Sequence, residues 1–150
     1  MNETTNNEIT NSEITNNEIT NSEITNLAIS LLEVQSSNKR IETLIRAISD
    51  KKATNIVILD LREIVSFTDY FILCSGRATR QVQAIADEAQ DQLRKEGCRT
   101  SHIEGYQKAE WILMDYGDFV VHIFGQEARE FYNLERLWRD AKRTEIKDEV

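Results

Sequence analysis

The chain has 150 residues, the length of one globular domain, and a formal charge of −8 at pH 7. Residues 1–26 hold five Glu and no Lys or Arg, which leaves only −3 of that charge for residues 27–150. A nearly balanced domain without a long basic run lacks the positive surface needed for direct, sequence-specific nucleic-acid binding. A protein partner or a small ligand is expected instead.

No run of the sequence approaches the eighteen apolar residues of a membrane-spanning helix. No basic residue precedes Lys39, so neither an ordinary signal peptide nor an Arg-rich transit peptide is expected. The two cysteines, Cys74 and Cys98, are too few for a disulfide framework. These features favour a cytoplasmic protein with reduced, buried thiols.

Residues 1–26 are a low-complexity repeat in which Asn-Asn-Glu-Ile-Thr alternates with Asn-Ser-Glu-Ile-Thr. Its isoleucines are five residues apart, a spacing that places them on one face of neither a helix nor a strand. The remaining residues are polar and bury too little apolar surface to offset the entropy lost on ordering. We therefore predict a disordered tail over 1–26 and a lead-in over 27–38. A short adhesive or partner-binding repeat is the alternative.

The pattern of a folded domain begins after the lead-in. Apolar residues recur at helical spacing over 41–48 and predict a helix. The β-branched and apolar runs 55–61 (NIVILDL) and 69–76 (DYFILCSG) predict two strands that are covered on both faces. A second helical stripe over 82–93 is followed by Gly97, a residue suited to the left-handed position that ends helices.

The second half of the domain predicts a short strand around 99–104 and then a hairpin. Its strands, 111–114 and 119–124, flank a polar turn in which Gly117 can adopt a positive φ. Apolar residues at helical spacing over 134–141 predict a closing helix.

These elements predict a single α/β domain with a mixed sheet of about five strands and flanking helices. The domain is expected to cover residues 39–143. Residues 144–150 are expected to form a charged C-terminal tail.

Alternation along the second hairpin strand separates its two faces. The odd-numbered residues of 119–124 are all apolar and are expected to pack against helices. The even-numbered residues, Val120, His122 and Phe124, combine apolar groups with an imidazole. A partly exposed sheet face of this kind, which Trp111 could extend, is typical of an interface.

The sequence contains no strong motif for catalysis. Two histidines twenty residues apart, with no CxxC or HExxH motif, do not predict a metal site. The segment SGRATR at 75–80 could bind phosphate at a helix start, but a glycine turn with Thr79 capping the helix is the simpler interpretation. Asp115 and Asp118 bracket a turn rather than forming the Asp-x-Asp pair that holds Mg²⁺ in nucleotidyltransferases.

Three blocks of the sequence resemble the Iojap family of ribosomal silencing factors (RsfS). They are KKATNIVILDLREIVSFTDYFILCSGRATRQVQAIADE, EGYQKAEWILMDYGDFVVHIF and REFYNLERLWRDA, in this order. The resemblance covers about residues 39–143, whereas the Asn/Glu repeat departs from the usual pattern of the family and has no role in it.

The resemblance implies a nucleotidyltransferase-like fold that lacks the catalytic carboxylates and uses no cofactor. It implies binding to ribosomal protein fourteen of the large subunit, on the face that meets the small subunit. Occupation of that face would block subunit joining and repress translation under nutrient limitation or in stationary phase. Family members tend to be homodimers when free, and bacterial members are cytoplasmic.

The resemblance and the mixed sheet face together predict a partner-binding site on the hairpin and the helix that follows it. The predicted contact residues are Trp111, Asp115, Asp118, Val120, His122, Phe124, Arg129, Tyr132 and Trp138. For Phe131 and Trp138, packing in a helix core is the alternative. A nucleotide-binding or nucleotidyltransferase-type enzyme and a dimeric adaptor for another protein remain alternative functions.

Overall fold

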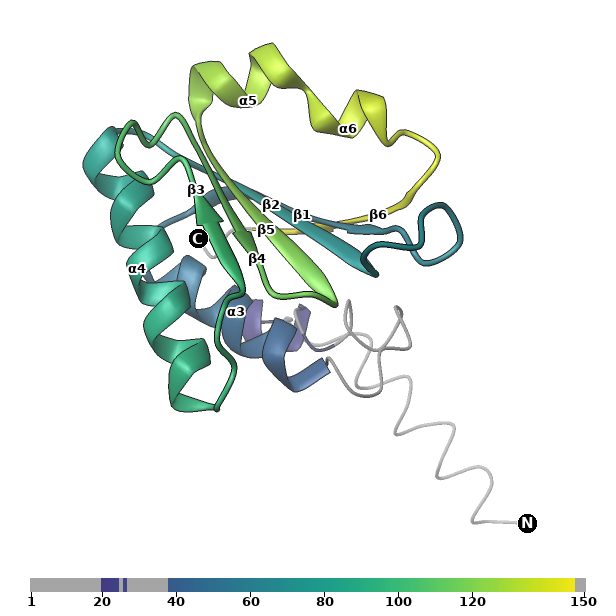
Figure 1. The fold of residues 1–150 in the computed structure, drawn as a ribbon, viewed down its shortest axis with the longest axis horizontal. Coiled ribbons are helices and arrows are strands. Elements are labelled where there is room, and N and C mark those ends of the chain that lie inside the picture. The colour runs from purple at the N-terminus through teal and green to yellow at the C-terminus, as the bar shows by residue number, and fades with distance from the viewer. Residues whose placement is uncertain (1–19, 25, 27–37, 148–150) are drawn as a thin grey trace.

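A computed structural model describes residues 20–24, 26 and 38–147, and the description below concerns these residues (Figure 1). The elements of the domain are α3 Asn38–Asp50, β1 Thr54–Asp60, β2 Tyr70–Gly76, α4 Thr79–Lys95, β3 His102–Glu104, β4 Trp111–Asp115, β5 Phe119–Gly125, α5 Gln126–Tyr132, α6 Leu134–Leu137 and β6 Lys142–Ile146. The six strands form one sheet in the order β3-β4-β5-β2-β1-β6. Strands β2 and β5 are parallel and every other neighbouring pair is antiparallel.

Helices α3 and α4 cover one face of the sheet (Figure 1). The apolar stripes of both helices pack against inward-facing residues of all six strands, with Ile103 of β3 only partly buried. These stripes include fully buried Ile41, Leu44, Ile85 and Leu93. The Phe119, Val121 and Ile123 side chains of β5 lie in the same core, as alternation along the strand predicted. This face carries the larger of the two hydrophobic cores.

The other face of the sheet carries α5, α6 and a smaller hydrophobic core (Figure 1). Residues of β1, β2 and β5 that alternate with those of the first core line it, among them Leu59, Leu73 and Phe124. Strand β2 is buried along its whole length, and residues 56–59 of β1 are buried too, so both strands are covered on both faces as predicted.

The C-terminal part of the domain differs from the sequence-based prediction. The sheet has six strands rather than about five, because residues 142–146 form edge strand β6, which extends into the charged tail expected over 144–150. Only Ile146 of this strand is buried, so its hydrophobic pattern is too weak to indicate a strand. Of the expected closing helix over 134–141, only residues 134–137 are helical, as α6. Helix α5 precedes it over 126–132, where periodicity predicted no helix, and Asn133 in a left-handed conformation separates the two.

Residues 21–24 form a helical turn, where the sequence predicted disorder. Residues 1–19 of the predicted tail, most of the predicted lead-in and residues 148–150 lie outside the described part of the chain. Gly97 and Gly117 have φ angles of 79° and 86°, which confirms the left-handed positions expected after α4 and in the β4–β5 turn.

Gly105, directly after β3, lies closer to neighbouring backbone than the other glycines do. Its φ is 82°, and a Cβ atom at this position would lie 2.0 Å from the carbonyl oxygen of Trp111. The backbone after β3 therefore passes directly against the first residue of β4, and only glycine allows this approach.

We expect Gly105→Ala to lower the free energy of unfolding by clearly more than Gly117→Ala. Both changes force an L-residue into a left-handed conformation, which costs about 1–2 kcal/mol. A Cβ at Gly117 meets nothing within 4 Å, whereas at Gly105 it collides with backbone. Urea denaturation of the two variants measures the difference, and equal losses would contradict the close approach.

Candidate partner-binding site

A network of rings extends across the α5–α6 side of the sheet. Its members contact one another with centroid separations of 4.4–6.3 Å. We call this set the ring network; it comprises Phe67, Phe71, Trp111, His122, Phe124, Phe131, Tyr132 and Trp138. Its residues come from the β1–β2 loop, β2, β4, β5, α5 and the end of α6, so one surface depends on six segments of the chain.

His122 lies at the centre of the ring network and is only 3% exposed. Its Nδ1 accepts a hydrogen bond of 3.1 Å from the indole Nε1–H of Trp111. Nε2 therefore carries the proton of the neutral imidazole, yet it has no hydrogen-bond partner among the described residues. Burial, assisted by the charge of nearby Arg129, lowers the pKa of His122 to about 3, so the ring is neutral near pH 7.

Arg129 attaches the two short helices to the sheet. Its guanidinium donates to Ser75 Oγ on β2 at 2.9 Å and to both carboxylate oxygens of Glu135 on α6, the shortest contact being 2.9 Å. Burial alone would raise the pKa of Glu135, but the hydrogen bonds and charge of Arg129 lower it overall. Arg129 is 9% exposed, so its main contacts are within the domain.

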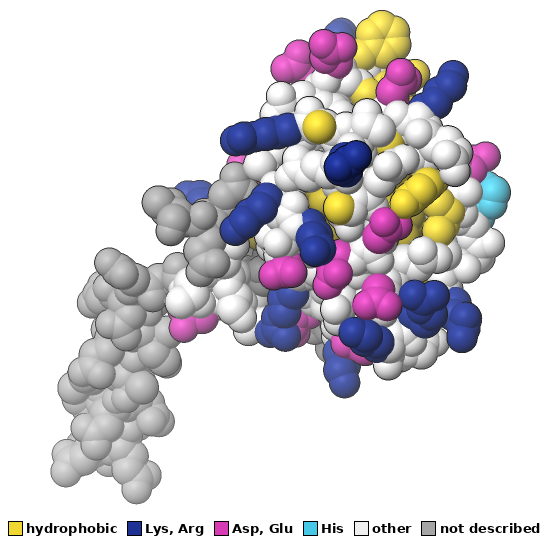
Figure 2. Space-filling model, turned by 90° about the vertical axis from the view of Figure 1, so that its left-hand side faces the viewer, with side chains coloured by type: hydrophobic (Ala, Val, Ile, Leu, Met, Phe, Trp, Pro, Cys, Tyr) yellow, Lys and Arg dark blue, Asp and Glu magenta, His cyan; other side chains and the backbone are white. Residues whose placement is uncertain are grey.

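Several large hydrophobic side chains remain exposed on this side of the domain. Phe131 is 81% exposed, Leu137 71% and Tyr132 48%, all three on α5 and α6. Phe67 and Ile64 of the β1–β2 loop are 63% and 41% exposed. Figure 2 shows hydrophobic side chains at the upper end of the molecule, where α5 lies, among acidic and basic ones. Exposed groups of this size and number are typical of an interaction surface.

The structure brings together seven of the nine predicted contact residues. Trp111, His122, Phe124, Tyr132 and Trp138 belong to the ring network, and Val120 and Arg129 lie in the same layer. The expectation that Val120, His122 and Phe124 form a partly exposed face is wrong, because they are 7%, 3% and 0% exposed. Helices α5 and α6 and the ring of Phe71 cover them.

The two predicted acidic residues lie apart from the ring network. Asp115 holds the β4–β5 turn, since its Oδ1 accepts from the backbone N–H of Gly117 at 2.8 Å. Asp118 forms an ion pair of 2.6 Å with Arg40 of α3, on the other side of the sheet.

Sequence reasoning missed several residues of this surface. Alternation along β2 could have identified Phe71, which lies opposite Val120 in the register of the β2–β5 pair. Phe131 was expected in a helix core as an alternative to surface contact, but it is the most exposed large hydrophobic residue among those described. No sequence signal distinguishes it from a helix-core residue.

The features that could support catalysis are scattered. Ala78, not Thr79, occupies the position that precedes α4, and no side chain caps this helix. Burial raises the pKa of Cys74 to about 12, so this thiol is not a nucleophile at neutral pH. Among residues 20–24, 26 and 38–147, no group of three or more His, Cys, Asp or Glu side chains is placed to hold a metal ion.

The chain matches the family model described as ribosomal silencing factor during starvation over residues 34–150. The ribosomal silencing factor RsfS of Halalkalibacterium halodurans is 40% identical over 111 residues, which cover 74% of this chain and 95% of that protein. The mouse protein named mitochondrial assembly of ribosomal large subunit protein 1 is 31% identical over 65% of this chain and 44% of its own length. A crystal structure of a Chromobacterium violaceum protein has a TM-score of 0.68 at 32% identity, covering 70% of this chain and 88% of that one.

The chain belongs to the ribosomal silencing factor family. The match begins within the predicted lead-in and extends to the last residue, and therefore includes β6. The described part of the chain contains no helix both long and apolar enough to cross a membrane.

We expect His122→Gln to weaken the acid sensitivity of folding. Because the folded-state pKa of His122 is lowered from 6.5 to about 3, the unfolded chain binds one more proton between these pH values. Wild-type stability should therefore fall as the pH drops below about 6.5, with a contribution from His122 of about 2 kcal/mol at pH 5. A glutamine side chain does not titrate, and its amide oxygen can still accept the Trp111 hydrogen bond.

Urea denaturation at pH 7 and pH 5 measures this difference. If the His122 variant loses as much stability on acidification as wild type, His122 is not held neutral by burial.

Proposed function

We propose that this protein binds the large ribosomal subunit through ribosomal protein fourteen and thereby blocks joining of the small subunit. It represses translation in the cytoplasm under nutrient limitation or in stationary phase, and it acts by occupying a surface rather than by catalysis. Membership of the ribosomal silencing factor family supports the ribosomal role. The mouse relative, whose name refers to the ribosomal large subunit, supports that subunit as the partner.

The observation that carries the proposal is the exposed hydrophobic surface on α5 and α6. Trp111 connects it to the sheet through a ring contact of 4.8 Å with Tyr132, and Tyr132 contacts Phe131 at 5.0 Å. Aromatic side chains at the centre of an interface usually carry most of the binding free energy. In the proposed complex, Trp111, Phe131, Tyr132 and Leu137 contact the partner directly.

The remaining predicted residues do not contact the partner directly in the proposed complex. Val120, His122, Phe124 and Trp138 support the exposed rings, and Arg129 fixes α5 and α6. Asp115 holds the β4–β5 turn and Asp118 is paired with Arg40 on the other side of the sheet, so neither contacts the partner in the proposed complex. Their charge acts on a basic ribosomal protein only at long range, through the association rate. The net charge of −8 acts in the same direction.

The free protein is proposed to be a homodimer, as the family resemblance implies. A second copy that covers the same rings would exclude the partner, because each exposed ring can be buried only once. Dimerisation and ribosome binding would then compete, and the proportion of dimer would fall as large subunits are added.

We expect Trp111→Ala and the double change Phe131→Ala, Leu137→Ala each to weaken binding to large subunits by about 30-fold or more. This corresponds to about 2 kcal/mol, the usual loss at an interface hot spot. Co-sedimentation with purified large subunits over a concentration series measures it. Phe131 and Leu137 are largely exposed, so the double variant should keep wild-type stability.

Tyr106→Ala is the matched control for loss of a half-buried aromatic residue. Tyr106 packs against the core under α4 on the opposite face, and its loss should leave ribosome binding unchanged. If the Phe131–Leu137 double variant binds as wild type, α5 and α6 are not the contact surface. If wild-type protein itself does not co-sediment, the ribosomal role is wrong.

A further inference from the structure

The last unit of the N-terminal repeat has a defined local structure. Thr20 Oγ1 accepts a hydrogen bond from the backbone N–H of Glu23, and the Glu23 carboxylate accepts one from the N–H of Thr20, both at 3.1 Å. The N–H of Ile24 closes the turn on the carbonyl oxygen of Thr20 at 2.9 Å. This reciprocal arrangement is the capping box, which starts a helix with Thr at the cap and Glu three residues later.

The same five-residue unit occurs four times without interruption. Residues 5–9, 10–14, 15–19 and 20–24 each read Thr-Asn-Asn/Ser-Glu-Ile. Thr and Glu, which form the capping box, are present in every copy, and only the third residue varies. The five-residue period therefore repeats a helix-start signal rather than a continuous helix or strand.

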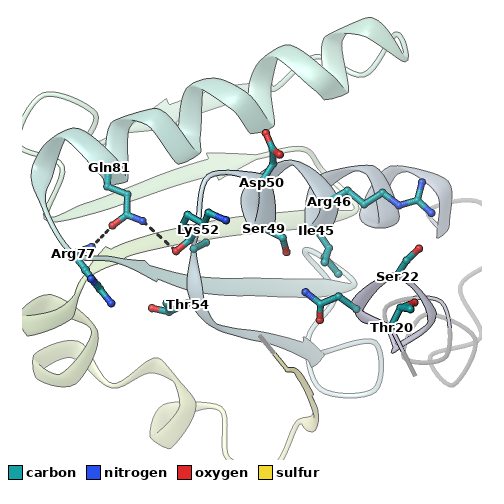
Figure 3. Close-up of a pocket in the computed structure, with 12 residues that line it drawn as sticks. Thr20, Ser22, Ile45, Arg46, Ser49, Asp50, Lys52, Thr54, Arg77 and Gln81 are labelled. Carbon is teal, nitrogen blue, oxygen red and sulfur yellow. Dashed lines mark hydrogen bonds between the residues drawn. The ribbon is translucent and has the colours of Figure 1, made fainter. Parts of the chain in front are cut away.

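The turn at residues 20–24 lies against the α3 side of the domain, opposite α5 and α6 (Figures 1 and 3). A cavity of about 800 Å³ separates it from the domain. Thr20, Asn21 and Ser22 form one wall, and the other wall includes Ser49 and Asp50 of α3 and Thr54 of β1. Asn21 and Ile24 are half-buried although the segment is polar. We call the domain side of this cavity the tail groove.

The rim of the tail groove carries unbalanced positive charge. Gln81 joins Arg77 to the α3–β1 turn: its Oε1 accepts from the Arg77 N–H at 2.6 Å and its Nε2 donates to the Lys52 carbonyl oxygen at 3.1 Å. Among the described residues, neither Lys52 nor Arg77 has an ion-pair partner, whereas Arg46 is paired with Glu42. Asp50 is the one acidic residue among those described that line the cavity.

Each repeat unit supplies the complementary charge. Each unit contains one Glu and no basic residue, so a docked unit adds one negative charge to a groove whose lining includes Lys52 and Arg77. A single capped turn is not stable alone, because helix nucleation is unfavourable. Docking on the groove would supply the missing stability. Four tethered copies also raise the local concentration of units about fourfold over one copy.

We propose that the tail groove binds one Thr-Asn-Asn/Ser-Glu-Ile unit of the chain's own N-terminus and that the four units are interchangeable occupants. The tail then shifts along the groove in steps of five residues, because each step presents the same capping box and charge. The groove lies on the opposite face of the sheet from the ring network. Occupation of the groove therefore leaves the proposed partner surface free.

Amide chemical shifts of groove residues Ser49, Thr54 and Gln81 in the full-length protein test the proposal. Thr20→Val removes one cap without changing the charge, and we expect wild-type shifts because a neighbouring unit takes its place. Changing all four cap residues, Thr5, Thr10, Thr15 and Thr20, to Val should displace the shifts to those of an empty groove. A synthetic peptide of two Thr-Asn-Ser-Glu-Ile units should restore them saturably.

The matched control is Asn7→Ser with Asn17→Ser, which makes the four units identical and should leave the shifts unchanged. For the groove side, Lys52→Glu with Arg77→Glu should abolish docking. The same charge change at exposed Lys108 and Arg139 should not abolish it.

Wild-type groove shifts in the fourfold Val variant would show that no unit docks. Equal displacement in Thr20→Val and the fourfold variant would show that only the last unit docks. Either result overturns the proposal. Co-sedimentation of the fourfold variant with large subunits should match wild type, which keeps this test separate from that of the ribosomal role.

Discussion

The attachment of α5 and α6 to the sheet depends on the buried guanidinium of Arg129. These helices have seven and four residues, too few to be stable without tertiary contacts. Arg129 joins β2, α5 and α6 through Ser75 and Glu135, alongside the apolar packing of Ala128, Leu134 and Trp138 on the smaller core. Removal of either charged partner would leave a buried charge uncompensated, which is far more costly than loss of a surface ion pair.

A layer of two short helices covers only the middle of the second sheet face. The centre of this face is therefore fully buried, as Phe124 and His122 show, while its margins stay open. The exposed Phe131 and Leu137 result from the same geometry, since no further element packs above α5 and α6 in the described chain. The burial of the centre of this face and the exposure of hydrophobic side chains at its margins therefore have the same structural cause.

Much of the fold could be predicted from periodicity. Strands β1, β2, β4 and β5 and helices α3 and α4 bury long apolar runs or stripes, so their signals do not depend on distant parts of the chain. Alternation also assigned Phe119 and Val120 to opposite faces correctly. Strand β6 and helix α5 escaped prediction because edge pairing and one buried arginine, rather than apolar periodicity, hold them.

The sequence predicted most of the residues that lie together in the candidate site, but not how exposed their side chains are. Alternation shows which side chains share a face, but the covering of that face is decided by residues after Gly125, which form two short helices rather than the one helix predicted over 134–141. His122 illustrates the consequence: an imidazole between Val120 and Phe124 suggests contact with water, yet it is desolvated beneath Phe71 and the two helices. In the proposed complex it therefore does not contact the partner directly. Its Nδ1 accepts the hydrogen bond that orients the Trp111 indole. This half-buried indole in turn contacts the exposed ring of Tyr132.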